Sequence, residues 1–333
     1  MGIFEVFPSM FILKLGIVAF YIGLVVMILW TVLKLIRGHY QKTGERKWQR
    51  VTAWLNVIIL SPVIMPIVFG PIIGYYAYKI EPNWIEVTEQ TFIDERFPKG
   101  IEDLTIVQIS DLHTQQYGQR EQRLVSKVNR LRPDIILING DFINDQQGWE
   151  PVYEVLAHLK AKRAVYAILG NTDYYYGRES QIIDRMKGVG IEVLTHRAVK
   201  VEVGLQKHFW IVGLSERWGQ HAYYGHVKYV DLAFEGVPVE DAKILMVHDP
   251  VQADMPILNK YNPQLILAGD NHGGQVGIPF LRHFSDYANR PYLGGTFYVQ
   301  DRPLYVNRGI GVKTLPLRFL CRPEITVVKL RKN

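Results

Sequence analysis

The feature that most constrains the fold of this chain is a set of short apolar runs. Each run is followed by a side chain of a type that binds metal ions. Five such runs lie in its C-terminal two thirds. A short apolar run of this kind is typical of a buried strand whose end delivers the next side chain to a loop. Five of them in one domain predict strand ends that share one site. The runs are 106–109, 135–138, 165–169, 244–247 and 265–267, and the residues that follow them include Asp111, His113, Asp141, Asn171, His248, Asp270 and His272.

The order of apolar and amphipathic segments predicts an α/β fold. Strand-like and helix-like segments alternate in the first half of the domain, which favours βαβ units and a mainly parallel sheet. The second half adds further strand-like runs, so we expect two sheets packed face to face and covered by helices. Strands are expected at 104–110, 134–139, 164–169, 191–194, 199–203, 209–214, 244–247, 265–268, 296–299, 304–307 and 325–330, and helices at about 119–131, 151–161 and 178–189.

The motifs at the strand ends resemble those of a known family. In chain order they are Asp111-Leu112-His113, Gly140-Asp141, Gly170-Asn171-Thr172-Asp173, the isolated His248, and Gly269-Asp270-Asn271-His272. This order resembles that of the calcineurin-like metallophosphoesterases, and the resemblance runs from about residue 104 to 330. It implies an α/β fold in the form of a four-layer αββα sandwich.

The predicted ligands fit borderline or hard divalent ions. Asp111 and His113 are separated by one residue, so in an extended chain both side chains lie on one face and can bind one ion. Carboxylate, imidazole and amide ligands together favour Mn²⁺, Fe²⁺ or Zn²⁺. We expect two divalent ions, with Mn²⁺ favoured. By resemblance, the first ion is bound by Asp111, His113, Asp141 and His272, and the second by Asp141 as the bridging ligand with Asn171, His248 and Asp270.

Two positions depart from the family pattern. Thr172 stands where the family has a histidine that assists the leaving group, and Asp270 stands where it has a metal-binding histidine. Threonine is not a general acid near pH 7, so the site favours leaving groups that depart without a proton. Asp270 either binds the second ion, which favours Mn²⁺, or marks a weakened second position. The resemblance implies catalytic roles for Asn171, Thr172 and Asp173.

The implied activity is hydrolysis of a phosphodiester or pyrophosphate bond by a two-metal-activated hydroxide. Within the family, the Gly273-Gly274-Gln275 and Leu315-Pro316-Leu317-Arg318-Phe319 segments look like those of the UDP-2,3-diacylglucosamine pyrophosphatases of lipid A biosynthesis. We therefore expect a phosphorylated lipid or nucleotide-lipid as the substrate. The alternative is a degenerate, metal-binding membrane protein with little or no catalysis.

Two uncharged stretches near the N-terminus predict a membrane anchor. Leu15–Leu33 and Val51–Tyr78 contain no charged residue, and about 20 apolar residues span a bilayer. We expect a transmembrane hairpin in residues 1–80, a polar linker in 81–100 and the metallophosphoesterase domain in 101–333. Pro62, Pro66 and Pro71 leave open whether the second stretch crosses the bilayer or only enters one leaflet.

The charge pattern favours a location in the bacterial cytoplasmic membrane. The segment between the apolar stretches carries most of the basic excess, which the positive-inside rule puts in the cytoplasm. The side on which the domain lies depends on whether the second stretch crosses. We therefore expect the net charge of +6 to interact with anionic lipid headgroups and not with nucleic acid. The sequence indicates no oligomeric state, and the single cysteine, Cys321, excludes an internal disulfide and a thiolate zinc cluster.

Arginines and aromatic residues outside these motifs are candidates for substrate contacts. Guanidinium groups match phosphate geometry, and aromatic clusters either pack their own loops or form a rim that stacks a base or holds acyl chains. The arginines are Arg217, Arg282, Arg318 and Arg322, and the aromatic residues are Tyr174, Tyr175, Tyr176, Trp218, Tyr223 and Tyr224.

Overall fold

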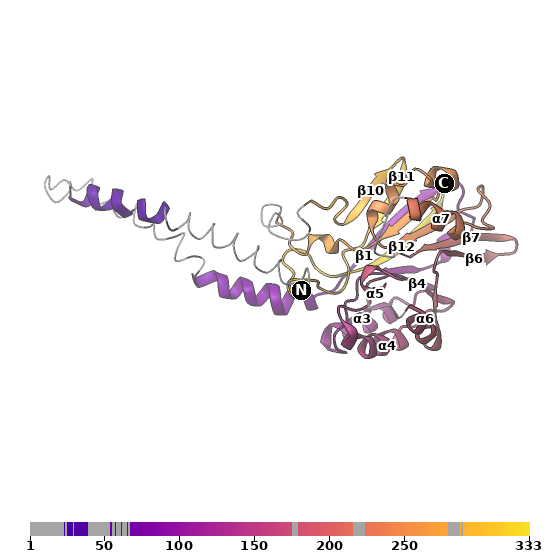
Figure 1. Cartoon of the computed structure of the whole chain (residues 1–333), viewed down its shortest axis with the longest axis horizontal. Helices are drawn as coiled ribbons and strands as arrows, with labels where there is room; N and C mark the ends of the chain where they lie inside the picture. Colours follow the sequence, from indigo (N-terminus) through magenta and orange to yellow (C-terminus); the bar gives the residue numbers. More distant parts are fainter. Residues whose placement is uncertain are drawn as a thin grey trace. The chain divides into compact units, whose positions relative to one another are not determined.

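The computed structural model describes most of the chain after residue 66. It covers residues 67–174, 179–215, 224–278, 287 and 289–333, together with scattered residues between 23 and 65. The chain divides into two units, Met1–Tyr76 and Ala77–Asn333. The candidate site lies wholly in the second unit, whose layers are visible in Figure 1.

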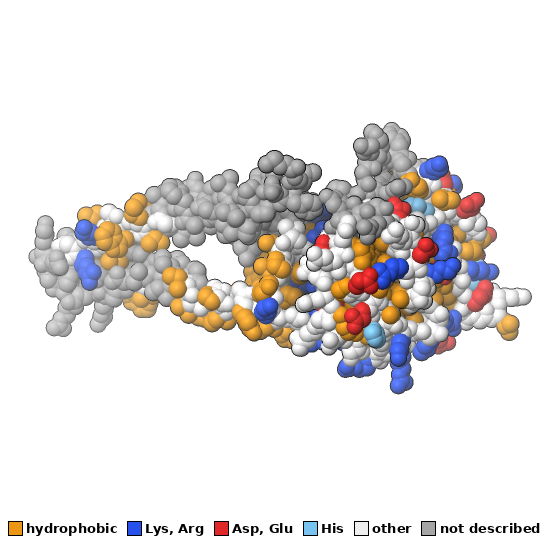
Figure 2. All heavy atoms as spheres, turned by 60° about the horizontal axis from the view of Figure 1, so that its bottom comes forward, with side chains coloured by type: hydrophobic (Ala, Val, Ile, Leu, Met, Phe, Trp, Pro, Cys, Tyr) orange, Lys and Arg blue, Asp and Glu red, His pale blue; other side chains and the backbone are white. Residues whose placement is uncertain are grey.

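The described residues of the N-terminal unit are helical. Many of their apolar side chains are exposed, including Ile67, Phe69 and Ile72, and Figure 2 shows such side chains in orange. The expected membrane spans, Leu15–Leu33 and Val51–Tyr78, fall partly outside the described residues. Within the described part of the chain, no helix is both long enough and apolar enough to cross a bilayer. The transmembrane hairpin therefore stays a prediction of the sequence.

The first sheet has six strands in the order β1-β12-β2-β3-β4-β5. Strands β2 to β5 are parallel, and β12 is antiparallel to β2 and parallel to β1. The carboxyl ends of β2, β3 and β4 therefore lie along one edge of the sheet. The strands are β1 (Glu86–Asp94), β2 (Ile106–Ile109), β3 (Ile135–Asn139), β4 (Ala164–Ile168), β5 (Ile191–Val193) and β12 (Glu324–Lys332).

The second sheet also has six strands, in the order β10-β11-β9-β8-β7-β6. Its four central strands are parallel, whereas the two edge strands are antiparallel to their neighbours. Both sheets are therefore mixed, with the expected parallel pairing in the middle. The strands are β6 (Arg197–Gly204), β7 (Lys207–Leu214), β8 (Lys243–Val247), β9 (Leu265–Ala268), β10 (Gly295–Val299) and β11 (Arg302–Val306).

Alternation along the central strands creates the layers. In β3, Ile135 and Leu137 pack into the cluster between the sheets, whereas Ile136 and Ile138 pack against helices. In β8, Leu245 faces the cluster that contains residues of α7 (Tyr224–Ala233). Strands buried on both faces read as continuous apolar runs, which explains why the sequence pattern located them. Helices thus cover the outer face of each sheet, with α3, α4 and α6 on the first (Figure 1).

The long helices of the first half lie within three residues of their expected bounds. They are α3 (Gln119–Arg130), α4 (Trp149–His158) and α6 (Glu179–Gly188). Short elements were not expected, because one or two turns carry too little periodicity to be read. These are α5 (Asn171–Tyr174), α8 (Leu258–Tyr261), the π-helix η2 (Tyr76–Ile80) and the 3₁₀ segments η3 (Glu81–Asn83), η4 (Ile101–Asp103), η5 (Gln146–Gly148), η6 (Pro250–Asp254) and η7 (His272–Gly274).

The segment 81–100, expected to be a polar linker, contains part of the folded unit. Strand β1 pairs with β12 along its whole length, and Glu81 is buried, with its carboxylate accepting the N–H groups of Leu320 and Cys321. The sequence pattern did not predict this strand, because the less exposed face of β1 carries mostly polar residues and only Phe92 on that face is apolar and buried. The second unit accordingly begins at Ala77.

Candidate metal centre

All seven ligands predicted from the sequence are buried at the carboxyl ends of parallel strands. Three of the ligand loops follow β2, β3 and β4 of the first sheet, and two follow β8 and β9 of the second. The two sheets therefore supply one site from five strand ends. The ligands are Asp111, His113, Asp141, Asn171, His248, Asp270 and His272.

The ligand loops adopt an unusual backbone conformation. Asp111, His113, Asp141, Asp270 and His272 have φ angles between 41° and 62°. A positive φ is uncommon for residues other than glycine, and such strain concentrates at functional sites. Each loop thus turns sharply away from its strand and directs the side chain into the shared site.

The buried groups form two sets able to hold an ion. The first contains Asp111, His113 and His272, and the second contains Asp111, Asp141 and His248; the ligand atoms of each set lie within 4.8 Å of one another. His272 Nε2 lies 3.6 Å from Asp111 Oδ1 and 3.1 Å from His113 Nε2. Asp111 belongs to both sets, which the sequence did not predict.

Asp141 faces both sides of the centre with different oxygens. Its Oδ2 lies 3.4 Å from His113 Nε2, and its Oδ1 lies 3.3 Å from His248 Nε2. A carboxylate that presents one oxygen to each of two ligand sets has the arrangement expected of a bridging ligand. Gly140 and Gly170 permit it, because a Cβ on Gly140 would lie 2.4 Å from Gly170 N.

Unpartnered buried atoms give an independent test of metal binding. Asn171 Oδ1 and His248 Nε2 are buried and have no hydrogen-bond partner among the described residues. His248 Nδ1 lies 2.6 Å from Asn139 O and must donate to it, so Nε2 carries the lone pair in the neutral ring. Buried polar atoms are rarely left unpaired, and these two atoms carry the lone pairs that a divalent cation needs in its ligands. The residues therefore fit a metal ion.

The electrostatics of the centre also favour a cation. Burial raises the pKa of Asp111 to about 7 and lowers the pKa of His113 to about 3. Burial lowers the pKa of His248 as well, but the carboxylates of Asp141, Asp111 and Asp270 outweigh it and hold that pKa well above its usual value. Bound protons thus offset part of the negative charge of the carboxylates, and a divalent cation would displace these protons.

Asp270 lies at the centre but also has a second partner. Its Oδ1 lies 3.6 Å from His248 Nε2, and its Oδ2 accepts a hydrogen bond from Arg290 Nη1 at 2.9 Å. Its backbone N–H donates to Asp111 Oδ1 at 3.1 Å. One oxygen of Asp270 is therefore directed toward the predicted second ion, while the other pairs with an arginine.

The three residues predicted to be catalytic have different surroundings. Asn171 Oδ1 is buried without a hydrogen-bond partner among the described residues, and the Thr172 N–H donates to Asp141 Oδ1 at 3.0 Å. Asp173 instead accepts the N–H groups of Gly170, Asp141 and Phe142 at 2.9–3.0 Å. Because its oxygens accept backbone N–H groups, Asp173 holds two ligand loops together, which favours a positioning role. Its catalytic role stays a prediction of the sequence.

A lysine that the sequence reading missed reaches the centre. Lys313 Nζ lies 3.5 Å from Asp141 Oδ2. Burial opposes its charge, but Asp141, Asp270 and Asp111 raise its pKa. Gly309 and Gly311 allow the approach, since a Cβ on either would lie within 3 Å of the Asp111–His113 loop. This glycine pair ahead of a lysine was the available signal.

The loop that carries Lys313 is held in place by Gln275 and Arg318. Gln275 donates to Lys313 O at 3.0 Å and accepts from Lys313 N at 2.6 Å. Arg318 is completely buried and donates to the carbonyls of Arg308, Gly309 and Gly311. Its donors are thus used by the backbone, which corrects the expectation that Arg318 clamps a phosphate.

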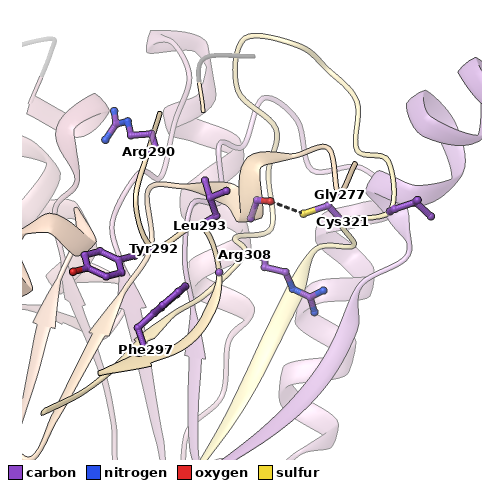
Figure 3. A pocket seen from close by; sticks show the side chains of 10 residues that line it. Gly277, Arg290, Tyr292, Leu293, Phe297, Arg308 and Cys321 are labelled. Carbon is purple, nitrogen blue, oxygen red and sulfur yellow. Dashed lines mark hydrogen bonds between the residues drawn. The ribbon is translucent and has the colours of Figure 1, made fainter. Parts of the chain in front are cut away.

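A pocket of about 450 Å³ lies beside the ligand loop that follows β9. Tyr292, Leu293 and Phe297 line one part of it, and Cys321, whose thiol donates to Gly273 O, lines another (Figure 3). A Cβ on Gly273 would lie 2.6 Å from Cys321 Sγ. Glycine at position 273 is therefore required for this packing.

Other candidates are only partly described. Arg322 stacks over Trp84, and its guanidinium carbon lies 3.7 Å from the centre of the ring. Tyr174 packs against the hydrophobic cluster between the first sheet and its helices. Neither contact involves the ligands. Most of the remaining expected arginine and aromatic residues lie outside the described residues, namely Arg217, Arg282, Tyr175, Tyr176, Trp218 and Tyr223, and of Tyr224 only the backbone, at the start of α7, is described.

Comparison with known proteins identifies the family. The family model described as calcineurin-like phosphoesterase matches residues 104–274, which contain every predicted ligand. The chain belongs to this family. As a calcineurin-like phosphoesterase it is a metal-dependent hydrolase of phosphoesters.

Relatives of this phosphoesterase occur in bacteria and animals. The uncharacterized metallophosphoesterase YkuE of Bacillus subtilis is 31% identical over 78% of this chain and 91% of its own length. A Danio rerio protein named as a transmembrane protein with metallophosphoesterase domain is 29% identical over 72% of this chain, which spans 55% of that protein. The solved structure of TT1561 from Thermus thermophilus is 10% identical, with a TM-score of 0.43 over 62% of this chain and 90% of that one.

Proposed function

We propose that this phosphoesterase hydrolyses a phosphodiester or pyrophosphate bond with two divalent ions, for which Mn²⁺ is the best match. The observation that carries the proposal is the pair of ligand sets that meet at Asp111 and Asp141. His113 and His272 serve the first ion, and His248, Asn171 and Asp270 serve the second. An excess of oxygen ligands at the second position favours Mn²⁺ over Zn²⁺.

When bound, the ions supply Lewis acidity and an activated water for in-line displacement at phosphorus. The chain supplies positioning and charge. His248 is oriented by its bond to the Asn139 carbonyl, and Asp173 fixes the backbone that carries Asp141. Such pre-organised groups avoid reorganisation during the reaction.

Lys313 and Arg290 bring two cations to the ligand carboxylates, at Asp141 and Asp270. We assign Lys313 to the phosphoryl oxygens, because its side chain is 31% exposed and its ammonium lies 3.5 Å from the bridging carboxylate. It supplies positive charge where negative charge develops in the transition state. Thr172 supplies no proton to the leaving group, so the best substrates have leaving groups that depart as stable anions.

A phosphorylated lipid or nucleotide-lipid at the bacterial cytoplasmic membrane meets these requirements. The uncharged N-terminal stretches and the transmembrane relative from Danio rerio support a membrane location for the enzyme. UDP-2,3-diacylglucosamine, which has a pyrophosphate and a nucleotide leaving group, is one such substrate. This specificity is a narrower prediction, based on the Gly273-Gly274-Gln275 and Leu315-Pro316-Leu317-Arg318-Phe319 segments.

The proposal is tested with the full chain solubilised in detergent. Aryl phosphodiesters, nucleotide pyrophosphates and alkyl phosphomonoesters are offered with Mn²⁺, Fe²⁺ or Zn²⁺, and Asp141→Ala serves as the inactive control. We expect turnover of the first two classes, lost on chelation and in the control. An absence of turnover with every metal, while the wild-type chain still binds ions, would favour the degenerate metal-binding protein.

A further inference from the structure

A second pocket, of about 420 Å³, is lined by residues of η2, η3 and α3 and contains none of the metal ligands. Three of its lining side chains are cationic, namely Lys79, Arg123 and Lys127. No acidic side chain is among the described residues that line it. A concave, uncompensated basic surface of this kind attracts an anion.

The rim of this pocket is apolar and aromatic. Trp84 lines the pocket and is 49% exposed, and Ile80, also in the lining, is 42% exposed. Arg322 stacks on the Trp84 ring, and Lys79 lies 4.4 Å from the centre of the exposed Tyr78 ring. Half-exposed Trp and Tyr side chains with flanking Lys and Arg are typical of a membrane–water interface.

The position of the pocket in the chain identifies the source of the anion. The uncharged stretch that begins at Val51 ends at Tyr78, and Lys79 is the next residue. Among the described residues of that stretch, Ile72, Ile73 and Tyr75 are exposed. Basic residues that directly follow an apolar stretch bind anionic headgroups, and a ligand with acyl chains would use both the cations and the apolar rim.

We propose that this pocket binds the phosphate headgroup of an anionic phospholipid, separately from the metal centre. Arg123 and Lys127 lie one turn apart on α3, and Lys79 approaches from η2. The three cations face one phosphate, while Trp84 and Ile80 contact the adjoining glycerol and acyl carbons. Bound lipid would hold the start of the catalytic unit at the membrane surface.

The test uses the full chain in neutral detergent with a chelator present, so that phosphate binding to metal ions is eliminated. Short-chain phosphatidylglycerol is titrated calorimetrically, with short-chain phosphatidylcholine and inorganic phosphate as the other arms. Each cation near an anionic surface contributes about fivefold in affinity. Arg123→Gln/Lys127→Gln should therefore weaken phosphatidylglycerol binding by about 30-fold, whereas Arg130→Gln/Arg132→Gln, which removes the same charge outside the pocket, should leave it unchanged.

Three results would overturn the proposal. Equal loss in both double variants would indicate a general charge effect, and equal binding of phosphatidylcholine would remove the need for an anion. Binding of inorganic phosphate as tight as that of the lipid would assign the pocket to a soluble anion. If the first double variant does not fold, Lys79→Gln, in η2, replaces it, with an expected loss of about fivefold in phosphatidylglycerol affinity.

Discussion

Arg290 is paired with Asp270, its Nη1 lying 2.9 Å from Asp270 Oδ2. This ion pair engages the oxygen that is turned away from His248 and leaves Oδ1 directed toward it at 3.6 Å. The family pattern that the sequence resembles has a histidine at the position of Asp270, so the arginine offsets the charge that the aspartate adds. The pair explains how a carboxylate can replace a neutral ligand without overloading the centre with negative charge.

Asp270→Ala should therefore remove one ion and spare the other. We expect the wild-type chain to bind two Mn²⁺ ions and the variant to bind one, because Asp111, His113 and His272 are unaffected. Metal content after gel filtration measures this directly. Arg290→Gln is the matched control and should keep both ions, since Asp270 remains; two ions in Asp270→Ala would show that Asp270 is not a ligand.

Replacing Thr172 with histidine should extend the range of leaving groups. The Thr172 hydroxyl is buried without a hydrogen-bond partner among the described residues, and its N–H is fixed on Asp141. A positioned general acid contributes about 10²–10⁴-fold when the leaving group needs a proton. Thr172→His should thus accelerate alkyl phosphodiesters while changing aryl esters little, as measured by kcat for each series. Thr172→Val, which lacks a proton donor, should give no gain, and equal gains with both ester classes would argue against the assignment.

Lys313→Met should lower turnover and strengthen metal binding together. Loss of one positioned donor costs about 10²–10³-fold in kcat, while removal of the ammonium beside Asp141 Oδ2 leaves that oxygen free for an ion. Steady-state kinetics and Mn²⁺ titration report the two effects separately. Lys313→Arg should recover part of the rate. A variant with unchanged kcat, or with metal affinity reduced in parallel, would exclude this role for the lysine.

Metal affinity should fall steeply as the solution becomes acidic. In the metal-free protein, the pKa of Asp111 is raised to about 7 and the pKa of His248 is raised well above its ordinary value. Each proton that the ion displaces costs about tenfold in affinity per pH unit below the pKa of its group. We expect about tenfold per unit just above pH 7, from His248, and about 100-fold per unit below it, when Asp111 also holds a proton. Calorimetric titrations in buffers of different ionisation enthalpy count these protons, and identical affinities at pH 6 and pH 8 would contradict the expectation.

Asp173→Asn should affect stability more than chemistry. The carboxylate accepts three buried backbone N–H groups. In the variant an amide NH₂ group, which is a hydrogen-bond donor, replaces one of the accepting oxygens, so at least one backbone N–H loses its acceptor. An unsatisfied buried group costs about 1–3 kcal/mol, so the free energy of unfolding should fall by about that amount. Guanidinium unfolding of the metal-free chain measures it. A large loss of kcat with unchanged stability would support the direct catalytic role first predicted for this residue.

The sequence by itself determined the central strands and the ligand types. Strands such as β3 and β8 are buried on both faces, so their apolar runs are continuous and their ends are unambiguous. A polar side chain directly after such a run must lie at the carboxyl end of the strand. Asp111, Asp141 and His248 could therefore be named without coordinates.

Tertiary structure decided what surrounds those ligands. Lys313 reaches Asp141 only because glycines let a distant loop pack against the Asp111–His113 turn. The buried Glu81 likewise accepts the backbone N–H groups of Leu320 and Cys321, which are distant in the sequence. Such contacts depend on how distant loops approach one another and on which way each side chain points, and neither follows from local periodicity.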